Sequence, residues 1–578
     1  MKYELRPRLV ESLKGYNRET FMKDLMAGII VGIVALPLAI AFGIASGVTP
    51  EKGIVTAIVA GFLISLLGGT KVQIGGPTGA FIVIIYGIVN NPQYGLQGLL
   101  IATMLAGVIL IALGVFRLGA VIKFIPYPII IGFTAGIAVT IFTTQMGDVL
   151  GLSQEAVTEA GEVVRIPLKT PGDFIGKWVC YAQNIRSFNP WNFLVAIVGI
   201  LVIIVSPRAL RSVPVLNKIP GSLWCIVVGT VGVLLLKQYG ITGIDTIGDR
   251  FHIQSQLPPM QVPKITFAMI QTLMPVAFTI AILGAIESLL SATVADGAIS
   301  DRHDSNMELI AQGVANMVTP IFGGIPATGA IARTMTNINN GGRTPVAGLI
   351  HAVVLLLILL LLMPYAEYIP MASLAAVLVI VSYNMSGWRA FRGLLHNPKS
   401  DVTVLIVTFL LTVIFDLTIA IEMGLIIACA LFIKRVMETT EISVIKDEID
   451  PSDEADMHLQ DKSLVIPQGC AVYEINGPYF FGIANKFDDL QMAMGHDKPR
   501  VQIIRMRKVP FIDSTGIHNL SNLILMNHEK GVHVILSGVT PKVHSQLEKA
   551  GFYQKMNPNH ICPHIDVALE QAREILKG

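Results

Sequence analysis

The sequence GGPTGAF at residues 75–81 recurs in related form as GGIPATGAI at residues 323–331. Gly76 and Gly324 lie 248 positions apart in the chain. Apolar stretches that begin near Leu25 and Ile270 repeat at nearly the same interval, 245 positions. Two matches at one interval indicate an internal repeat. Glycine and proline in both copies predict that each interrupts an otherwise apolar segment.

The apolar segments around these motifs are long enough to cross a membrane. Hydrophobic residues make up 53% of the 578 residues and charged residues only 14%, against about 25% charged in soluble proteins. A spanning helix needs about 20 apolar residues, which predicts about 14 spans here. The segments are 25–46, 53–69, 74–90, 96–116, 121–141, 191–206, 221–236, 270–295, 325–338, 344–363, 369–386 and 401–433.

Several of these segments contain a predicted break. Prolines interrupt segments 25–46, 74–90, 121–141 and 325–338, and the run 401–433 is long enough for two helices. Division into two repeats, about 25–237 and 270–436, gives each repeat seven spans. Because seven is odd, the two repeats have opposite orientations in the membrane, which is an inverted repeat.

The two broken segments predict an anion site. Irregular backbone at membrane depth is tolerated where it is buried in protein or lines a cavity. A helix that begins in mid-membrane directs free N–H groups and a partial positive charge at its start. Two such half-helices from inverted repeats would face each other near the midplane, where they attract an anion. The alternative is that these glycines only allow close packing of helices.

Three polar residues near the broken segments are candidates for substrate or ion binding. Arg333 lies one turn beyond Gly329 and is predicted to balance the substrate charge, with a structural counter-ion as the alternative. Glu287 lies within segment 270–295. It is predicted to bind a coupling H⁺ or Na⁺, with a static pair to Arg333 or an interhelical hydrogen bond as the alternative. Ser291, one turn further on, would add a hydroxyl ligand to a Na⁺ site.

Charged residues divide the chain further and set its orientation. Residues 1–24 form a basic N-terminal segment, 25–436 the membrane domain, and 437–462 an acidic linker. Residues 463–578 alternate strand-like runs with helical stretches, which predicts a small α/β domain. Lys and Arg in the short loops place both termini in the cytoplasm. The longer loops 142–190 and 238–268 then lie outside.

Other classes of function are disfavoured. The five cysteines show no metal-ligand spacing, and no catalytic triad or nucleotide-binding loop is evident. We therefore expect neither an enzyme nor a nucleic-acid-binding protein. The expected partners are a small anion, the lipid bilayer and a coupling ion, and no cofactor is expected. The sequence DSTG at residues 513–516 is typical of a helix N-cap.

Longer motifs carry a resemblance to a known family. The stretch from Glu287-Ser288-Leu289-Leu290-Ser291 through residues 303–313 to the motif 326–333 resembles the sulfate permease (SulP) family of anion transporters. Residues 477–482 and 513–516 of the C-terminal part resemble a STAS domain. The resemblance covers essentially the whole chain. It implies fourteen spans in a seven-plus-seven inverted repeat, core and gate subdomains, an elevator-like movement, a homodimer and, for a bacterial member, the inner (plasma) membrane.

The resemblance also implies roles for individual residues. Glu287 matches a position at which some members carry a carboxylate linked to cation coupling. Leu38 stands where some proton-coupled members have an acid, which leaves Glu287 as the better candidate. Ser514 is expected to cap the helix that follows it. The alternative is a phosphorylation switch, because Ser514 matches a serine that can be phosphorylated in bacterial regulatory STAS proteins, and cytoplasmic regulators of this domain are expected. The anion-binding residues carried over are Phe42, Thr78, Gly79, Ala80, Thr328, Gly329, Ala330 and Arg333.

Sulfate is the expected substrate of a secondary transporter coupled to Na⁺ or H⁺. The alternatives are Na⁺-coupled bicarbonate transport, then H⁺-coupled transport of a C4-dicarboxylate. The remaining alternatives are a channel-like anion protein and an anion receptor that signals through the STAS domain.

Overall fold

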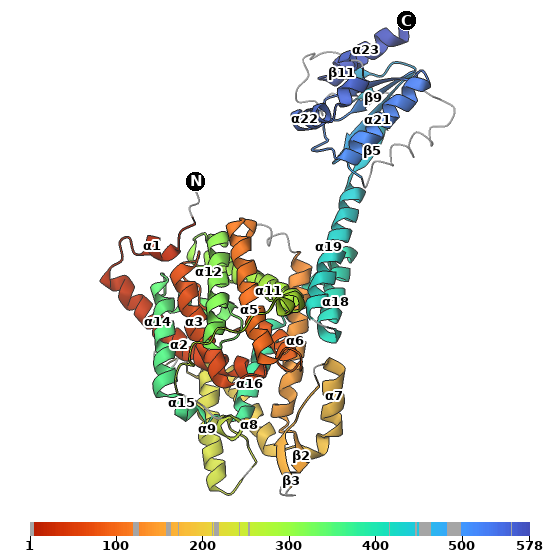
Figure 1. The fold of residues 1–578 in the computed structure, drawn as a ribbon. Helices are drawn as coiled ribbons and strands as arrows, with labels where there is room; N and C mark the ends of the chain where they lie inside the picture. Colours follow the sequence, from red (N-terminus) through yellow and green to blue (C-terminus); the bar gives the residue numbers. More distant parts are fainter. Residues whose placement is uncertain are drawn as a thin grey trace. The chain divides into compact units, whose positions relative to one another are not determined.

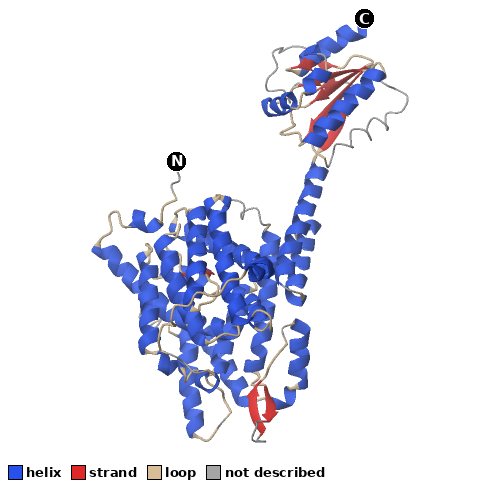
Figure 2. Ribbon diagram, viewed as in Figure 1, coloured by secondary structure: helices blue, strands red, loops and turns tan. Residues whose placement is uncertain are grey.

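The chain forms two compact units, Met1–Ile426 and Ile427–Gly578, and each is described by itself. The first unit is almost entirely helical and the second contains a mixed sheet (Figure 2). The computed structural model describes residues 5–119, 126–157, 163–171, 173–210, 212, 219–241, 243–251, 255–415, 417–445, 448–449, 464–481, 499–556 and 558–577.

Helices of the first unit follow the apolar segments of the sequence (Figure 1). Eight helical stretches within the described ranges are long and apolar enough to cross a membrane, by length and composition. They are α2 (Arg18–Ala45), α3 (Pro50–Leu67), α5 (Gly95–Val115), α6 (Tyr127–Val149), α8 (Pro190–Ala209), α9 (Gly221–Gln238), α11 (Phe267–Ile299) and Met371–Leu394, which combines α16 (Met371–Met385) with α17 (Trp388–Leu394).

Shorter elements complete this unit. The helices are α1 (Arg8–Ser12), α4 (Ile82–Val89), α7 (Phe174–Gln183), α10 (Ile247–Arg250), α12 (Ser305–Val318), α13 (Ile331–Asn339), α14 (Val346–Leu361), α15 (Met363–Ala366) and α18 (Lys399–Ile414). Strands β2 (Ser153–Val157) and β3 (Val163–Pro167) form an antiparallel pair. The helix α19 (Leu417–Thr439) continues across the boundary between the units.

Helices of the first unit pack in two groups. The core group consists of α2, α3, α5, α11, α12 and α14, which pack on one another. The gate group consists of α6, α8, α9, α16 and α18, which also pack mainly among themselves. Contacts of α2 with α9 and α16, and of α4 with α6, join the two groups. The division agrees with the core and gate subdomains that the family resemblance implies.

Three details differ from the sequence prediction or extend it. The first span is not broken at Pro37, which lies within the continuous helix α2. The run 401–433 does divide in two, because α18 ends at Ile414 and α19 begins at Leu417. Helix α12 is not among the predicted spans, because polar residues interrupt its apolar pattern.

The second unit contains a five-stranded sheet in the order β11-β10-β9-β8-β5. Strands β8 (Cys470–Asn476), β9 (Val501–Arg505), β10 (His533–Ser537) and β11 (Ile561–Cys562) run parallel, and β5 (Glu441–Ile445) is antiparallel. Helices α21 (Ser514–Glu529), α22 (Pro541–Lys549) and α23 (Ile565–Lys577) accompany the sheet. The strands β6 (Glu448–Ile449) and β7 (Leu464–Val465) form a separate antiparallel pair.

The predicted linker 437–462 needs a correction at its start. Residues 441–445 form the edge strand β5, which hydrogen-bonds to β8, so the sheet begins before the predicted domain start at residue 463. Glu441 and Ser443 alternate there with the apolar residues Ile442, Val444 and Ile445, and the abundance of acidic residues nearby obscured this strand pattern. Residues 446–447 and 450–462 of the predicted linker lie outside the described residues, as do residues 482–498 of the predicted α/β domain.

Candidate anion-binding site

The two broken segments lie side by side in the first unit. Residues Gly75–Gly76 form the short strand β1 and Thr328–Gly329 form β4, and the two strands pair antiparallel. Gly75 lies opposite Gly329, and Gly76 lies opposite Thr328. All four residues are buried. The internal repeat therefore brings together two segments that are far apart in the sequence, as the repeat interval predicts.

Each strand leads directly into a short helix. After β1 the chain forms the 3-10 turn η1 (Gly79–Phe81) and then α4, and after β4 it forms α13. The residues before η1 and α13, Thr78 and Ala330, provide no side-chain cap. The first N–H groups of a helix have no partner within the helix, and the helix dipole adds partial positive charge there. Two uncapped helix starts beside one paired strand ladder favour an anion.

Polar side chains satisfy the irregular backbone around the strands. The amide group of Asn316 donates to the carbonyl of Ala327 and accepts from its N–H, at 2.8 and 2.9 Å. The hydroxyl of Thr56 accepts from the N–H of Ile325 at 2.8 Å. Unpaired backbone groups in an apolar environment cost several kcal/mol each. These side chains explain how a non-helical segment is stable inside a helical membrane domain.

Arg333 lies in the first turn of α13 with its side chain almost fully buried. Its Nη2 donates to the carbonyl of Pro77 at 3.0 Å. Its Nη1 has no hydrogen-bond partner among the described residues, and a methyl group added to Gly76 would lie 2.2 Å from this atom. The guanidinium group therefore packs against β1. No carboxylate forms an ion pair with Arg333 in the part of the chain that the structure describes.

Glu287 contacts the residue that precedes the first half-helix. Its Oε2 accepts a hydrogen bond of 3.0 Å from the hydroxyl of Thr78, which directly precedes η1. Glu287 and Arg333 form no ion pair among the described residues, so the static pair that the sequence left open has no direct contact. Ser291 does not join Glu287, because its hydroxyl donates to Thr334 at 3.4 Å.

Phe42 and Gly79 lie where the core and gate groups meet. A methyl group added to Gly79 would lie 2.9 Å from Met385 Sδ, 3.4 Å from Ile141 Cδ1 and 3.6 Å from Phe42 Cε1. Phe42 belongs to α2 in the core group, whereas Ile141 and Met385 belong to α6 and α16 in the gate group. The predicted residues Phe42 and Gly79 therefore lie close together at this boundary.

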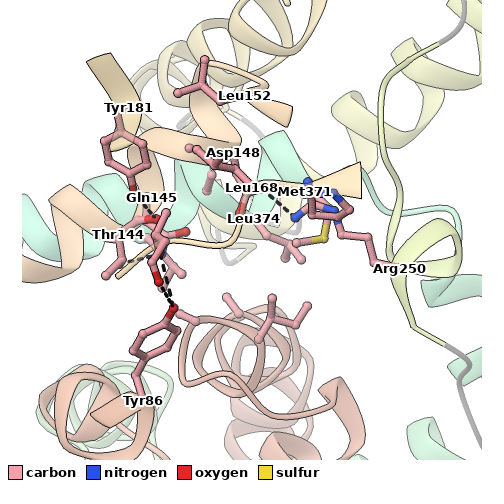
Figure 3. Close-up of a pocket in the computed structure, with 18 of the residues that line it drawn as sticks. Tyr86, Thr144, Gln145, Asp148, Leu152, Leu168, Tyr181, Arg250, Met371 and Leu374 are labelled. Carbon is pink, nitrogen blue, oxygen red and sulfur yellow. Dashed lines mark hydrogen bonds and ion pairs between the residues drawn. The ribbon is translucent and has the colours of Figure 1, made fainter. Parts of the chain in front are cut away.

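A separate cavity of about 310 Å³ is shown in Figure 3. Its lining includes Ala41 and Thr144, which are close in the sequence to Phe42 and Ile141, but none of the predicted anion-binding residues is among the described residues that line it. The core helix α2, the half-helix α4 and the gate helices α6 and α16 all contribute to its lining. The cavity lies at the C-terminal ends of α2 and α6, and a cytoplasmic N-terminus would place its opening on the outer side of the membrane.

Polar residues of this cavity were not predicted from the sequence. Tyr86 of α4 and Tyr181 of α7 direct their hydroxyls into the region shown in Figure 3. Arg250 lines the cavity as well, and it forms ion pairs with Asp148 at 2.7 Å and with Asp245 at 2.8 Å. Both acids compensate its charge. These residues lie in loops or near helix ends, where a single sequence offers no periodic signal.

The polar residues that support the pair of strands β1 and β4 were also not predicted from the sequence. The hydroxyls of Ser288 and Thr328 form a hydrogen bond of 2.6 Å, and the N–H of Gly329 donates to the hydroxyl of Ser288 at 3.1 Å. In α12, Glu308 and Gln312 are fully buried with Asn316, and each is hydrogen-bonded. A signal was present, because polar residues recur at every fourth position, 308, 312 and 316, on one helix face.

The predicted regulatory residue Ser514 lies in the second unit. It is the first residue of α21 and is exposed. The helix cap is the preceding Asp513, whose Oδ1 accepts from the N–H of Gly516 at 2.7 Å. The other carboxylate oxygen accepts from the N–H of Phe481 at 3.1 Å. The capping role expected at this motif therefore belongs to Asp513, which leaves the Ser514 hydroxyl unused as the cap.

Comparisons with known proteins agree on one family. The sulfate permease family model matches residues 21–408, and the STAS domain model matches residues 461–568. The putative sulfate transporter YvdB of Bacillus subtilis is 40% identical over 560 residues, covering 96% of this chain and 98% of the relative. The bicarbonate transporter BicA of Synechocystis sp. is 30% identical, with 95% and 94% covered.

Solved structures share the fold. The transmembrane domain of a cyanobacterial bicarbonate transporter BicA matches with a TM-score of 0.59 at 30% identity, covering 72% of this chain and 98% of that chain. The overall structure of SLC26A9 matches with a TM-score of 0.83 at 18% identity, covering 99% and 93%. The helical membrane fold is thus the one predicted. The chain belongs to the sulfate permease family of anion transporters and carries a C-terminal STAS domain.

Proposed function

We propose that this protein is a secondary active transporter of a small inorganic oxyanion, with sulfate as the favoured substrate. The observation that carries the proposal is the meeting of two uncapped helix starts at the β1–β4 pair, next to the unneutralised Arg333. The proposed binding groups are the N–H groups at the starts of η1 and α13. Phe42 would close the site on the side of α2.

The charge of the site supports a dianion. Each helix start contributes about half a positive charge, and Arg333 adds one, so the site offers about two positive charges. The Nη1 atom of Arg333, which makes no hydrogen bond to the described residues, is the part of the guanidinium group proposed to act on the anion. Sulfate carries two negative charges and four acceptor oxygens, which match this arrangement. The similarity to YvdB, a putative sulfate transporter, points in the same direction.

Glu287 is the proposed coupling residue. Its carboxylate lies within hydrogen-bond distance of Thr78, immediately before the first half-helix. A coupling Na⁺ or H⁺ at Glu287 would cancel its negative charge, and the anion would then bind more tightly. The contact between Ser291 and Thr334 argues against Ser291 as a ligand in this conformation.

The division into core and gate groups supports an elevator movement. The half-helices pack with the core group, whereas Ile141 and Met385 on the other side of Gly79 belong to the gate group. Sliding of the core group along the gate group would carry the bound anion between the two sides of the membrane. We further propose a homodimer in the bacterial inner membrane, with both termini in the cytoplasm.

Bicarbonate is the second candidate. The hydrogen bond between Glu287 and Thr78 favours it, because an ionised Glu287 leaves about one net positive charge. That charge suits a monoanion better than a dianion. The bicarbonate transporter BicA is also similar along nearly the whole chain.

Uptake by purified protein in proteoliposomes tests the proposal. Labelled sulfate and labelled bicarbonate are supplied in turn, each under an inward Na⁺ gradient and then under an inward proton gradient. We expect concentrative sulfate uptake under one of the two gradients. Uptake of bicarbonate alone would assign the second candidate, and equilibration without concentration under either gradient would contradict coupled transport.

A further inference from the structure

Glu308 of α12 is a fully buried carboxylate in the core group. Its Oε2 accepts from the N–H of Gly69 and from the hydroxyl of Thr70, both at 3.0 Å. Its Oε1 accepts from the amides of Gln73 and Gln312, both at 2.9 Å. Neutral donors thus surround both oxygens, and no Lys or Arg pairs with this carboxylate within the described ranges. Four donors of this kind stabilise an ionised carboxylate.

Gln73 connects this carboxylate to the anion site. Its Nε2 also lies 3.3 Å from the carbonyl oxygen of Ser288, to which it donates. A methyl group added to Gly329 would lie only 1.9 Å from the same nitrogen. The Gln73 amide therefore packs flat against the backbone of β4. Because Ser288 is itself hydrogen-bonded to Thr328 and Gly329, the contacts run without a gap from Glu308 to the predicted anion-binding residues.

From these contacts we propose that Glu308 is a positioning residue for the anion site. It fixes the amide of Gln73, and Gln73 in turn sets the position of Thr328 and Gly329 before the second half-helix. Glu308 belongs to the second repeat and Gln73 to the first, so this contact also sets the distance between the two half-helix starts. The inference rests on the proposed location of the anion, and it holds for either sulfate or bicarbonate.

Asp24 provides a matched control. It is also a fully buried carboxylate, and it joins α2 to the loop before α14. It accepts from the N–H groups of Arg343 and Thr344, at 3.0 and 3.3 Å, and from the hydroxyls of Tyr16 and Thr344. These contacts hold the loop before α14 and do not involve β1 or β4. A carboxylate that only stabilises the fold would behave like Asp24.

The test compares Glu308→Gln with Asp24→Asn in the full-length protein in proteoliposomes. In Glu308→Gln the negative charge is lost and an NH₂ group opposes two of the four donors, either those of Gly69 and Thr70 or those of Gln73 and Gln312. A hydrogen bond to a neutral acceptor is weaker than one to a carboxylate, so the Gln73 amide is held less firmly. We expect the KM of Glu308→Gln for the transported anion to rise at least about tenfold, with a smaller change in the maximal rate per inserted protein. Asp24→Asn should lower the melting temperature and leave the KM unchanged.

A double-mutant cycle adds a second readout. Gln73→Leu should raise the KM to a similar degree, and the double variant Glu308→Gln/Gln73→Leu should add little further. An unchanged KM in a folded Glu308→Gln protein, or fully multiplied effects in the double variant, would overturn the proposal.

A structure of Glu308→Gln separates this inference from the proposed substrate. We expect the Gln73 amide to leave Gly329 and the pair between Gly75 and Gly329 to open. This result is independent of which anion the wild-type protein carries, and an unchanged strand pair would refute the positioning role. Failure of the substrate proposal would instead appear in the wild-type uptake alone.

Discussion

The hydroxyl of Thr78 donates a hydrogen bond of 3.0 Å to the carboxylate of Glu287. Thr78 immediately precedes the first half-helix, and Glu287 lies in the middle of α11. The contact links a residue beside the proposed anion to the proposed coupling residue. A change of charge at Glu287 would therefore alter the electrostatic potential at the start of η1.

Replacement of Glu287 by Gln tests this link. The amide keeps a hydrogen-bond acceptor for Thr78 but cannot bind a proton or balance a Na⁺ at neutral pH. We expect uptake to lose its dependence on the driving cation gradient while anion exchange across the membrane continues. The measurement is initial uptake with and without each gradient. Gradient dependence equal to that of the wild-type protein would leave Glu287 with a structural role.

Thr78→Val provides the matched change on the other side of the contact. Valine has nearly the shape of threonine but cannot donate to Glu287. We expect a smaller loss of coupling than in Glu287→Gln, because the carboxylate remains. An effect larger than that of Glu287→Gln would indicate that the Thr78 hydroxyl contacts the anion itself.

Arg333→Ala should weaken anion affinity strongly. A hydrogen bond or close interaction with a charged group contributes about 1.5–3 kcal/mol, so removal of the charge should raise the KM by about 10- to 100-fold. Initial uptake over a range of anion concentrations gives this value, and size-exclusion chromatography in detergent verifies the fold. Retained affinity in a monodisperse Arg333→Ala protein would exclude Arg333 from the site.

Gly76→Ala should also disrupt the site. Gly76 has a φ of 156°, and an added methyl group would lie 2.2 Å from Arg333 Nη1. The guanidinium group or β1 must therefore move, and we expect uptake to fall at least about tenfold. The matched control is Gly232→Ala in α9, where an added methyl group meets nothing within 4 Å. Equal activity of the two variants would show that the close approach of Arg333 to β1 is unimportant.

Removal of residues 440–578 should spare anion affinity. This boundary keeps β5 with the sheet to which it belongs. All half-helix residues lie in the first unit, so we expect the KM to stay within about twofold of the full-length value while the maximal rate falls. Loss of affinity in a truncated protein that is correctly inserted would show that the STAS domain takes part in binding.

The sequence predicted the helical fold and the pairing of the broken segments because both depend on local patterns. Apolar length identified most spans, and the interval between Gly76 and Gly324 indicated the repeat. The side-chain direction of Arg333 could not be predicted, since its contact with Pro77 depends on the exact path of β1. The roles of Glu308 and Gln73 were hidden for a related reason. Polar residues in a span interrupt the apolar pattern, and their partners lie more than 200 positions away.

The central claim is that the anion binds between the starts of η1 and α13. Selenate has the shape and charge of sulfate, and its selenium scatters X-rays anomalously. A crystal structure of the protein with selenate tests the claim most directly. We predict one anomalous peak between the two helix starts, placed so that oxygens of the selenate accept hydrogen bonds from the N–H groups of Gly79 or Ala80 and of Ile331 or Ala332. A peak elsewhere in the protein, with these N–H groups unoccupied in crystals of transport-competent protein, would contradict it.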